Sequence, residues 1–481
     1  MRVLFVSSEA YPLIKTGGLA DVSGSLPIAL KKSHIDVKLL IPGYPAVLEK
    51  VEKQRSLGII QVYTHLSCEI IVGTMPNSTL EVIIIKNNLL YERDGGPYID
   101  AIHQDWHDNP LRFGTLSKVA SILSSANQLW DWFPDIVHCN DWQTGLTPYY
   151  IKQNPNSHAK TILSIHNLAF QGNFNRDWIS TLELTQSDFR PDGYEFYGQL
   201  SFLKTGVVYS DKISAVSPNY AKEIQTEAFG FGLQGLLQSR AADITGILNG
   251  IDTKEWNTQK NDYLPYSYSK TQLAGKAKIK AQLQQQLGLE VNPDKPILGV
   301  VSRLTYQKGL DVLIAVLPEL MPLDCQIVVL GSGEKSYEAS FSSFAKQYPQ
   351  QVAVTIGYNE KLSHQIMAGS DIFIMPSRFE PCGLNQLYGL RYGTPSVVTN
   401  TGGLADSICN TTLESVVNHT ATGFVMENVT KLSLFVTIKQ ALMVWQDKAI
   451  WKRIQNNGMQ QDLSWEHSAN AYISLYQAML D

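Results

Sequence analysis

The sequence predicts an α/β protein of two domains, each built on a parallel sheet. Its 481 residues are more than one hydrophobic core usually serves. Short apolar runs alternate with helical patterns along most of the chain, which is typical of parallel sheets. The hexapeptide TGGLAD occurs at Thr16–Asp21 and again at Thr401–Asp406. We expect two glycine-rich loops, one per domain, that face each other across a cleft and bind anionic or hydroxyl-rich ligands. Two ordinary tight turns are the alternative.

The first domain begins with a βαβ unit. Arg2–Ser7 (RVLFVS) is a continuous apolar run typical of a buried strand, and a helical pattern follows over Leu19–Lys31. Ligands of open α/β sheets bind beyond the carboxyl ends of strands, so polar residues at strand ends are the first candidates for chemistry. The remaining strands expected here are Asp36–Ile41, Glu81–Ile85, Ile136–His138, Lys160–Ile165, Asp211–Val216 and Thr245–Leu248.

A second α/β series begins near Pro296. The polar, aromatic segment Thr258–Lys276 is expected to connect the domains, and Ser464–Leu480 to form an amphipathic terminal helix. The strands expected in this half start at Ile297 (ILGVV) and include Gln326–Leu330, Val352–Ile356, Asp371–Met375 and Ser396–Val398.

Composition excludes several classes of protein. Hydrophobic residues make up 44% and charged residues 17%, which is ordinary for a globular protein and argues against disorder. The net charge of −5 argues against a nucleic-acid partner. No window has the roughly 18 apolar residues of a membrane span. The five cysteines form no CxxC pair or zinc spacing, so free thiols in a reducing compartment are expected.

Two strand-end motifs suit a phosphate group. Lys15-Thr-Gly17-Gly18 follows the first strand, where glycines let the backbone approach a phosphate and Lys15 adds charge. Arg303 and Lys308 follow the strand LGVV and suit a diphosphate leaving group. A turn with a surface lysine is the alternative for the first motif, and surface solvation is the alternative for the second.

Further motifs bear on sugar binding, covalent catalysis, dinucleotide binding and metal binding. Glu380 follows the strand DIFIMP and is placed to hold sugar hydroxyls, whereas Cys382 lacks a histidine signature and is expected to be structural. GxGxxG at Gly230 follows a helical stretch, so a dinucleotide site is not expected. His103 and His107 have the spacing of a metal pair but lie in a turn-rich stretch. A sugar-acceptor loop is favoured there, and no metal site is expected.

Together these segments resemble the glycogen/starch synthase family, the ADP-glucose-dependent retaining glycosyltransferases. The resemblance covers nearly the whole chain, in the family's order. It is carried by SSEAYPLIKTGGLADVSGSLP, DWHDNPLRF, PDIVHCNDWQTGL, IHNLAFQG, GILNGID, VSRLTYQKGLD, IGYNE and SRFEPCGLNQLYGLRYGTPSVVTNTGGLADS.

The resemblance implies the GT-B fold, two facing Rossmann-like domains with a deep cleft between them. It implies an N-terminal domain over 1–255 on the acceptor side and a C-terminal donor domain over 256–460. The terminal helix, 461–481, would pack back on the first domain. The implied reaction elongates an α-1,4-glucan from ADP-glucose and releases ADP, in a bacterial cytoplasm or a plastid stroma.

The resemblance also implies roles for single residues. Tyr358 is similar to the residue that stacks on adenine, and Glu380 to the carboxylate that binds glucose. The residues implied near the transferred sugar are Asp141, His166, Asn249 and Glu380, and those implied at the donor are Lys15, Gly17, Gly18, Arg303, Lys308, Tyr358, Gly383, Leu384 and Asn385. No cofactor or metal is expected, because cationic side chains neutralise the diphosphate. Membrane and nucleic-acid partners are not expected, and the sequence indicates no oligomeric state.

Three positions depart from related patterns. Many related transferases carry a second glutamate where Tyr388 stands, and family members often have threonine at Asn385 and an acid at Gln234. A two-glutamate mechanism is therefore not expected, and Asp141 is the one nucleophile worth testing. Two alternatives remain open: a related transferase that uses UDP-glucose, and a weakly active glucan-binding or priming protein. ADP release with and without glucan distinguishes the latter from an enzyme.

Overall fold

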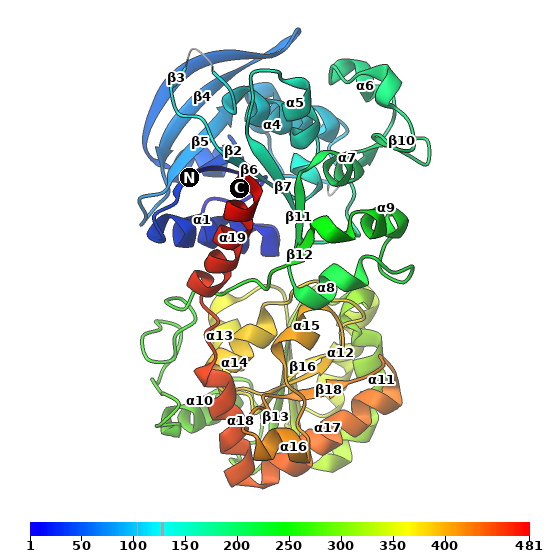
Figure 1. Ribbon diagram of the computed structural model, residues 1–481. Helices are drawn as coiled ribbons and strands as arrows, with labels where there is room; N and C mark the ends of the chain where they lie inside the picture. Colours follow the sequence, from blue (N-terminus) through cyan, green and yellow to red (C-terminus); the bar gives the residue numbers. More distant parts are fainter. Residues whose placement is uncertain (103, 127–128) are drawn as a thin grey trace. The chain divides into compact units, whose positions relative to one another are not determined.

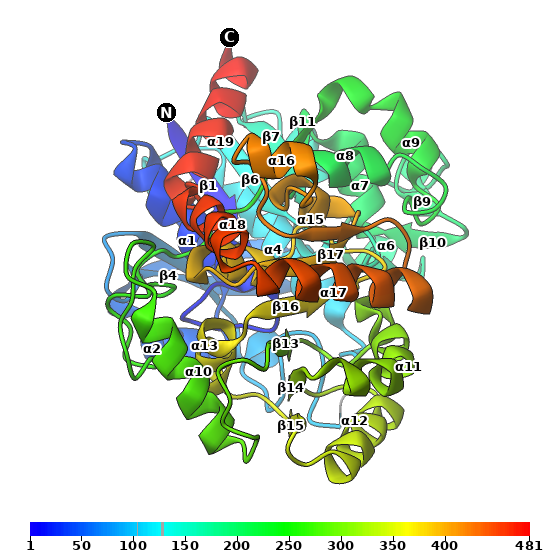
Figure 2. The ribbon, with the colours of Figure 1, turned by 90° about the horizontal axis from the view of Figure 1, so that it is seen from below.

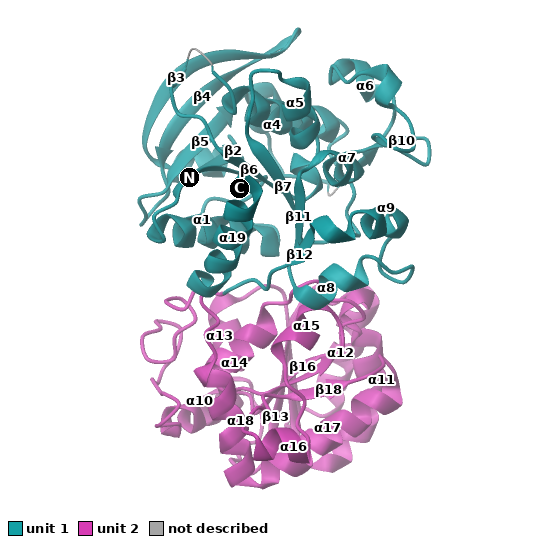
Figure 3. Ribbon diagram, in the orientation of Figure 1, with its two compact units in different colours: residues 1–250, 465–481 teal, residues 251–464 magenta. Residues whose placement is uncertain are grey.

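The computed structural model describes residues 1–102, 104–126 and 129–481 (Figure 1). It divides into two compact units (Figure 3). The first contains residues 1–250 and 465–481, and the second contains residues 251–464. The segment Thr258–Lys276, expected to connect the domains, therefore lies within the second unit. It contributes Tyr268, whose hydroxyl donates to the carbonyl of Tyr392 in that unit's interior.

A nine-stranded sheet forms the centre of the first unit. Its order is β12-β11-β7-β6-β1-β2-β5-β4-β3, parallel from β12 to β5 and antiparallel from β5 to β3. The strands are β1 Arg2–Val6, β2 Asp36–Pro42, β3 Glu52–Tyr63, β4 Leu66–Thr74, β5 Glu81–Lys86, β6 Ile136–Asn140, β7 Lys160–Ile165, β11 Lys212–Ala215 and β12 Ile244–Gly246.

Helices and a small second sheet complete this unit. Its helices are α1 Gly18–Lys32, α2 Pro45–Lys50, α3 Asn88–Tyr91, α4 Asn109–Leu123, α5 Thr147–Gln153, α6 Trp178–Thr181, α7 Phe202–Tyr209, α8 Pro218–Glu223, α9 Gln234–Ser239 and α19 Trp465–Leu480. Three short strands, β8 Asn173–Phe174, β10 Gln199–Ser201 and β9 Glu195–Phe196, pair antiparallel in that order.

The last helix of the chain, α19, packs against α1, the first helix (Figure 1). The hydroxyl of Tyr476 lies 2.6 Å from Nδ1 of His138, a buried residue of β6. Ser468 donates to the carbonyl of Leu248, just after β12. The C-terminal helix is thereby hydrogen-bonded to two segments that precede candidate site residues.

The second unit is built on a six-stranded parallel sheet. Its order is β15-β14-β13-β16-β17-β18, the 3-2-1-4-5-6 order of a Rossmann fold. The strands are β13 Ile297–Val301, β14 Gln326–Gly331, β15 Val352–Ile356, β16 Ile372–Met375, β17 Ser396–Thr399 and β18 Phe424–Met426. Each described strand is a short apolar run, as expected of a sheet covered on both faces.

Helices cover both faces of this sheet, with α10 and α13 on one side and α11 and α12 on the other (Figure 2). Alternate residues of β14 point into different cores: Ile327 and Val329 into one, Val328 and Leu330 into the other. The helices are α10 Ala274–Gln286, α11 Leu310–Leu320, α12 Lys335–Gln347, α13 Glu360–Gly369, α14 Asn385–Tyr392, α15 Gly402–Ser407, α16 Leu413–Val417, α17 Lys431–Gln446 and α18 Lys448–Gln460.

Candidate active site

Most candidate residues of the first unit follow three neighbouring strands, and Asn249 follows β12 at the edge of the same sheet. The sheet order reverses between β1 and β6, and β7 lies next to β6. Lys15 lies in the loop after β1, Asp141 directly after β6, and His166 directly after β7. Open α/β sheets bind ligands at such a reversal, beyond the carboxyl ends of the strands. The sheet therefore places residues from three separate segments of the chain at the carboxyl ends of its strands.

A buried carboxylate, that of Glu9, holds the loop after β1 in shape. Its Oε2 accepts from the backbone amides of Thr16, at 2.6 Å, and Gly17, at 3.3 Å. The hydroxyls of Thr16 and Tyr98 also donate to this carboxylate. Burial raises the pKa of Glu9 although these hydrogen bonds oppose the shift. Glu9 was not predicted as a site residue, although a carboxylate right after a buried strand is a signal that could have identified it.

The two glycines after Lys15 border open space. A Cβ atom added at Gly17 or Gly18 would meet no described atom within 4 Å. Gly17 has an extended backbone and Gly18 opens α1, so neither conformation demands glycine. The Lys15 ammonium lies 2.8 Å from Asp21 Oδ1, and its side chain is 42% exposed. The glycines leave room beside an accessible cation and the start of a helix, as phosphate binding requires.

Gly18→Ala is expected to leave the melting temperature unchanged or slightly higher, because alanine is the better helix former and meets no neighbour. The Michaelis constant for the nucleotide-sugar donor that the family resemblance implies should rise at least about tenfold, because the methyl group fills the space expected to hold phosphate. Steady-state kinetics and thermal unfolding measure the two effects. Gly403→Ala is the control for the effect on stability. A Cβ at Gly403 would lie 2.1 Å from the Cys382 carbonyl oxygen, so this substitution should lower the melting temperature. A normal Michaelis constant for Gly18→Ala would contradict the assignment.

Asp141 occupies a strained backbone position at the end of β6. Its φ of 56° and ψ of −171° fall in a region that residues other than glycine rarely adopt. Its Oδ1 accepts from the backbone amide of His166 at 2.7 Å. Burial raises the pKa of Asp141 to about 7, against the lowering effect of the amides of His166 and Asn167. The carboxyl group can therefore hold or release a proton near neutral pH.

The hydrogen-bond partner of His166 determines which of its two ring nitrogens carries the proton. Nε2 lies 3.0 Å from Oδ1 of Asn140, whose Nδ2 in turn donates to the Val6 carbonyl. Asn140 thus presents an acceptor, so Nε2 carries the ring proton. The low-dielectric surroundings lower the pKa of His166 to about 3, although the residue keeps some solvent exposure. The neutral ring leaves Nδ1 free to accept a hydrogen bond from a sugar hydroxyl.

Asn249, which follows β12, holds an unsatisfied acceptor. The residue is 7% exposed, and its Oδ1 is buried without a hydrogen-bond partner among the residues that the structure describes. An unpaired buried amide oxygen is energetically unfavourable, so it needs an explanation such as a bound water or a ligand. A ligand hydroxyl would satisfy this one.

Most candidates of the second unit follow β13 or β16, between which its strand order reverses. Arg303 is exposed in the loop after β13, and Lys308 ends a short 3₁₀ turn in the same loop. The Lys308 ammonium pairs with Oε2 of Glu380, which also accepts from the Ser377 hydroxyl at 3.1 Å. Glu380 is 8% exposed. The fold therefore brings a cation and a carboxylate into contact across 72 residues of chain.

Four further contacts fix these two loops. Arg378 donates to both carboxylate oxygens of Asp311 at 2.7 Å, and its guanidinium lies 3.6 Å from the centroid of the Tyr306 ring. Gln307 donates to the Phe379 carbonyl at 3.1 Å. Gly309 has a φ of 66°, and a Cβ there would lie 2.0 Å from the Pro376 oxygen. The two loops are thus held at close backbone distance, which preorganises Lys308 and Glu380.

The second TGGLAD copy has a structural role in this unit. Gly402 has a φ of 44°, and a Cβ there would lie 2.0 Å from the Glu380 carbonyl oxygen. The Gly403 amide donates to the carbonyls of Glu380 and Pro381, both at 3.1 Å. The glycines of this copy pack against the loop that carries Glu380, unlike those of the first copy. The two copies therefore differ in what their glycines contact, since one pair borders open space and the other contacts backbone, and the ligand binding expected of both loops stays a prediction.

The remaining donor candidates lie beside the same sheet edge. Tyr358, between β15 and α13, is 83% exposed and presents its ring to solvent. Gly383 has a φ of 70°, and Leu384 is the N-cap of α14. Asn385 opens α14 and donates to the Val301 carbonyl at 2.7 Å. Of these candidates, Asn385 contacts the last residue of β13, and Tyr358 follows the edge strand β15.

Three motifs are not among the candidate residues of this site: Cys382, the GxGxxG at Gly230 and the histidines His103 and His107. Cys382 is a buried thiol. Gly230 follows α8 and its loop rather than a strand. His103 lies outside the described residues, and His107 is exposed in the turn before α4. Within the described part of the chain, no helix is long and apolar enough to cross a bilayer.

Comparison with known proteins decides the family. Residues 2–239 match the model of the starch synthase catalytic domain, and residues 283–452 match the model of group 1 glycosyl transferases. The glycogen synthase of Nitrosomonas eutropha is 48% identical over 488 residues, which cover 100% of this chain and 96% of that protein. The chain belongs to the glycogen and starch synthase family. The glycogen synthase of Dechloromonas aromatica, another relative, is 46% identical and covers 99% of this chain and 98% of its own length.

Solved structures confirm that this family member has the GT-B fold predicted from the sequence. The catalytic domain of starch synthase IV from Arabidopsis thaliana, bound to ADP and acarbose, superposes with a TM-score of 0.87. It is 29% identical and covers 99% of both chains. Sucrose-phosphate synthase from Thermosynechococcus elongatus, at 16% identity and a TM-score of 0.56, shares the fold alone.

Proposed function

We propose that this chain transfers glucose from ADP-glucose to the non-reducing end of an α-1,4-glucan, retains the anomeric configuration and releases ADP. Membership of the glycogen and starch synthase family supports the reaction. The ADP bound to the similar starch synthase structure supports adenine as the base. The observation that carries the proposal is the paired Lys308 and Glu380 beside Arg303, at the strand-order reversal of a Rossmann sheet.

In the proposed reaction the bond between glucose C1 and the β-phosphate oxygen breaks, and C1 bonds to the acceptor hydroxyl oxygen on the same face. The acceptor proton passes to the departing phosphate. Arg303, Lys308 and Lys15 neutralise the charge that develops on the diphosphate, so this transfer is proposed to need no metal ion. Backbone amides from Gly383 to Asn385 add hydrogen bonds at the start of α14.

The sugar is held through its hydroxyl groups. Glu380 has its Oε2 engaged by Lys308 and Ser377, which leaves Oε1 directed to the ligand. Neutral His166 accepts a sugar hydroxyl at Nδ1, and Asn249 offers its unsatisfied Oδ1. Such contacts orient C1 for attack and contribute to rate by positioning. Asp141, near its pKa at neutral pH, stabilises positive charge on the sugar ring when it is ionised.

Glucose transfer to glycogen, measured with ADP-glucose and UDP-glucose side by side, tests the function. ADP release that depends on glycogen, with chain elongation and a strong preference for ADP-glucose, is the expected result. A preference for UDP-glucose would overturn the donor assignment, and no transfer from either donor would leave a glucan-binding or priming protein. Because the similar glycogen synthases come from bacteria such as Nitrosomonas eutropha, we place the reaction in a bacterial cytoplasm rather than in a plastid.

Tyr358→Ala is expected to raise the Michaelis constant for ADP-glucose by about 10- to 100-fold, because stacking of a base on an aromatic ring is worth roughly 1–3 kcal/mol. Little loss of stability is expected, since the ring is 83% exposed. Tyr358→Phe keeps the stacking face and is the matched control, with a Michaelis constant near that of the unaltered protein. Equal effects of both substitutions would exclude stacking as the role of this residue.

A further inference from the structure

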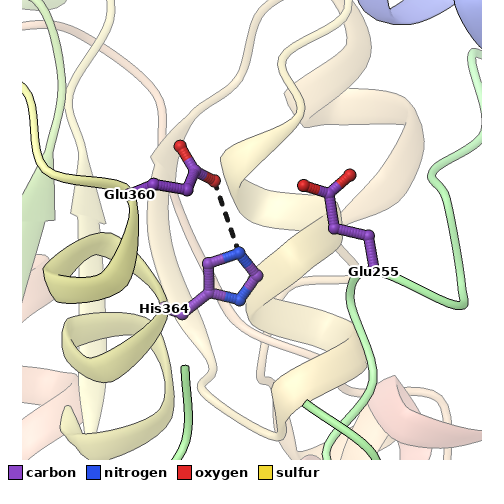
Figure 4. A group of neighbouring side chains, drawn as sticks. All are labelled: Glu255, Glu360 and His364. Carbon is purple, nitrogen blue, oxygen red and sulfur yellow. Dashed lines mark ion pairs between the residues drawn. The ribbon is translucent and has the colours of Figure 1, made fainter. Parts of the chain in front are cut away.

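Three side chains of the second unit, none of them assigned a role in glucosyl transfer, converge on one point beside Tyr358. They are Glu255, in the segment after β12, and Glu360 and His364, both on α13 (Figure 4). One ligand atom from each lies within 4.8 Å of the others. Carboxylate oxygen and imidazole nitrogen are the donors that first-row divalent metals share.

The helix dictates how two of these side chains meet. Asn359 caps α13 by accepting from the Leu362 amide at 2.9 Å, which starts the helix at Glu360. Residues four apart lie one above the other on the same face of a helix. Oε1 of Glu360 consequently lies 3.3 Å from Nε2 of His364. Glu255 approaches from a separate segment, with its carboxylate turned toward the same nitrogen (Figure 4).

The imidazole of His364 is buried and has one unsatisfied nitrogen. Its side chain is 0% exposed, and Nε2 makes no hydrogen bond to any described residue. The ring is stacked on Trp256, with centroids 4.0 Å apart and planes 12° apart. A stacked, fully buried ring cannot turn its polar edge to water. Nε2 is therefore held toward the two carboxylates without a hydrogen bond of its own, and a buried polar atom of this kind needs an explanation.

Nδ1, the opposite nitrogen of His364, lies beside Tyr392 Oη and 3.2 Å from Nδ2 of Asn261. Tyr392 Oη lies 2.8 Å from Nδ1, and the same oxygen accepts from Asn261 Nδ2 at 2.9 Å. Metal binding at Nε2 puts the ring proton on Nδ1, which Tyr392 Oη can accept with its second lone pair. Such an outer hydrogen bond fixes the tautomer and orientation of a metal-binding imidazole.

We propose that Glu255, Glu360 and His364 bind one divalent transition-metal ion, with Zn²⁺ as the best match and water in the fourth position. Two carboxylates and a neutral imidazole carry a net charge of −2, which the ion balances. Zinc bonds of roughly 2.0–2.2 Å in a tetrahedron set its donor atoms about 3.4 Å apart. Small rotations of the two partly exposed glutamates close the remaining distance.

The ion would link two segments of the second unit. One is the stretch around Glu255, which follows the first unit in the chain, and the other is α13, which begins two residues after Tyr358. The Tyr358 hydroxyl donates to the Glu360 carboxylate. The proposed site is thus structural and lies next to a donor candidate in sequence. It does not depend on the proposed transfer reaction, and its test uses binding and stability rather than turnover.

The test titrates Zn²⁺ into the full chain after chelator treatment and desalting, by calorimetry, with thermal unfolding in parallel. One saturable site and a rise in melting temperature are expected. Glu255→Gln and Glu360→Gln should each weaken Zn²⁺ binding at least about tenfold, because loss of even an outer-shell partner costs about 10- to 100-fold. Co²⁺ in place of Zn²⁺ should give the strong visible absorption of a four-coordinate ion, which both variants should lose.

Two controls separate this site from other metal binders on the chain. Glu414→Gln removes an exposed carboxylate of α16, and Cys409→Ser removes the free thiol that is not fully buried. Both should bind Zn²⁺ as the unaltered protein does. The proposal is overturned if no saturable site appears, or if both glutamine variants keep full affinity. In either case His364 would be explained instead by direct pairing with Glu360.

Discussion

Glu380→Gln is expected to lower kcat for glucosyl transfer by at least about 100-fold while the protein stays folded. Glutamine keeps the shape of the side chain but removes the charge that pairs with Lys308. The freed ammonium then binds the diphosphate in a changed position, and the sugar loses its strongest hydrogen-bond acceptor. Removal of one preorganised charged or polar contact in an active site typically costs 100- to 1,000-fold. Release of ADP in the presence of glycogen measures the effect.

The matched control for this substitution is Glu427→Gln, which makes the same chemical change at an exposed carboxylate of the same unit. It should keep normal kcat. The melting temperature of both variants must be recorded, because Glu380 is buried and its ion pair also contributes to stability. Near-normal turnover by folded Glu380→Gln would remove Glu380 from the site.

Asp141→Asn is expected to reduce kcat at least about 100-fold and yet raise the melting temperature at pH 8. The amide retains an oxygen for the backbone amide of His166 but cannot be ionised, so it offers no charge to the sugar. Asparagine has nearly the shape of aspartate, so the backbone strain of this position is the same in both proteins. The loss of function would thus come with a gain in stability, as is common for strained active-site residues.

The pH dependence of this gain follows from the raised pKa of Asp141. Its folded pKa, about 7, exceeds the ordinary value of 3.8, so between these values the folded protein binds a proton that the unfolded chain has released. The stability that Asp141 contributes is therefore full below about pH 4 and falls as the pH rises through 7. Asparagine removes this loss, so its advantage in melting temperature should grow from pH 5 to pH 8. A difference in melting temperature that stays constant from pH 5 to pH 8 would contradict the raised pKa of Asp141.

Much of the fold could be predicted because buried parallel strands are short apolar runs. Lys160–Ile165 and Val352–Ile356 were predicted to the residue. The antiparallel pair β3 and β4 was not predicted. β3 is mostly exposed and carries three irregularities in its pairing, so no alternation of apolar and polar residues marks it.

The candidate site was predicted in part, because strand-end composition is visible in the sequence. Arg303, Lys308 and Glu380 were identified that way, and their roles stay predictions. Glu9 was missed, since its function is to bind backbone amides of a loop rather than a ligand. The difference between the two TGGLAD copies was also missed, because identical hexapeptides carry no information about what their glycines contact.

The sequence by itself determined the α/β class, the family and the residue types available for phosphate and sugar. These depend on local hydrophobic patterns and on motifs within short segments. Only the tertiary structure decided which groups are paired, which are protonated and which are unsatisfied. The pKa of Asp141 and the unpaired atoms of Asn249 and His364 all arise from burial by segments distant in the chain. Burial removes water from a polar group, and which groups lose their water is a property of packing that no local pattern encodes.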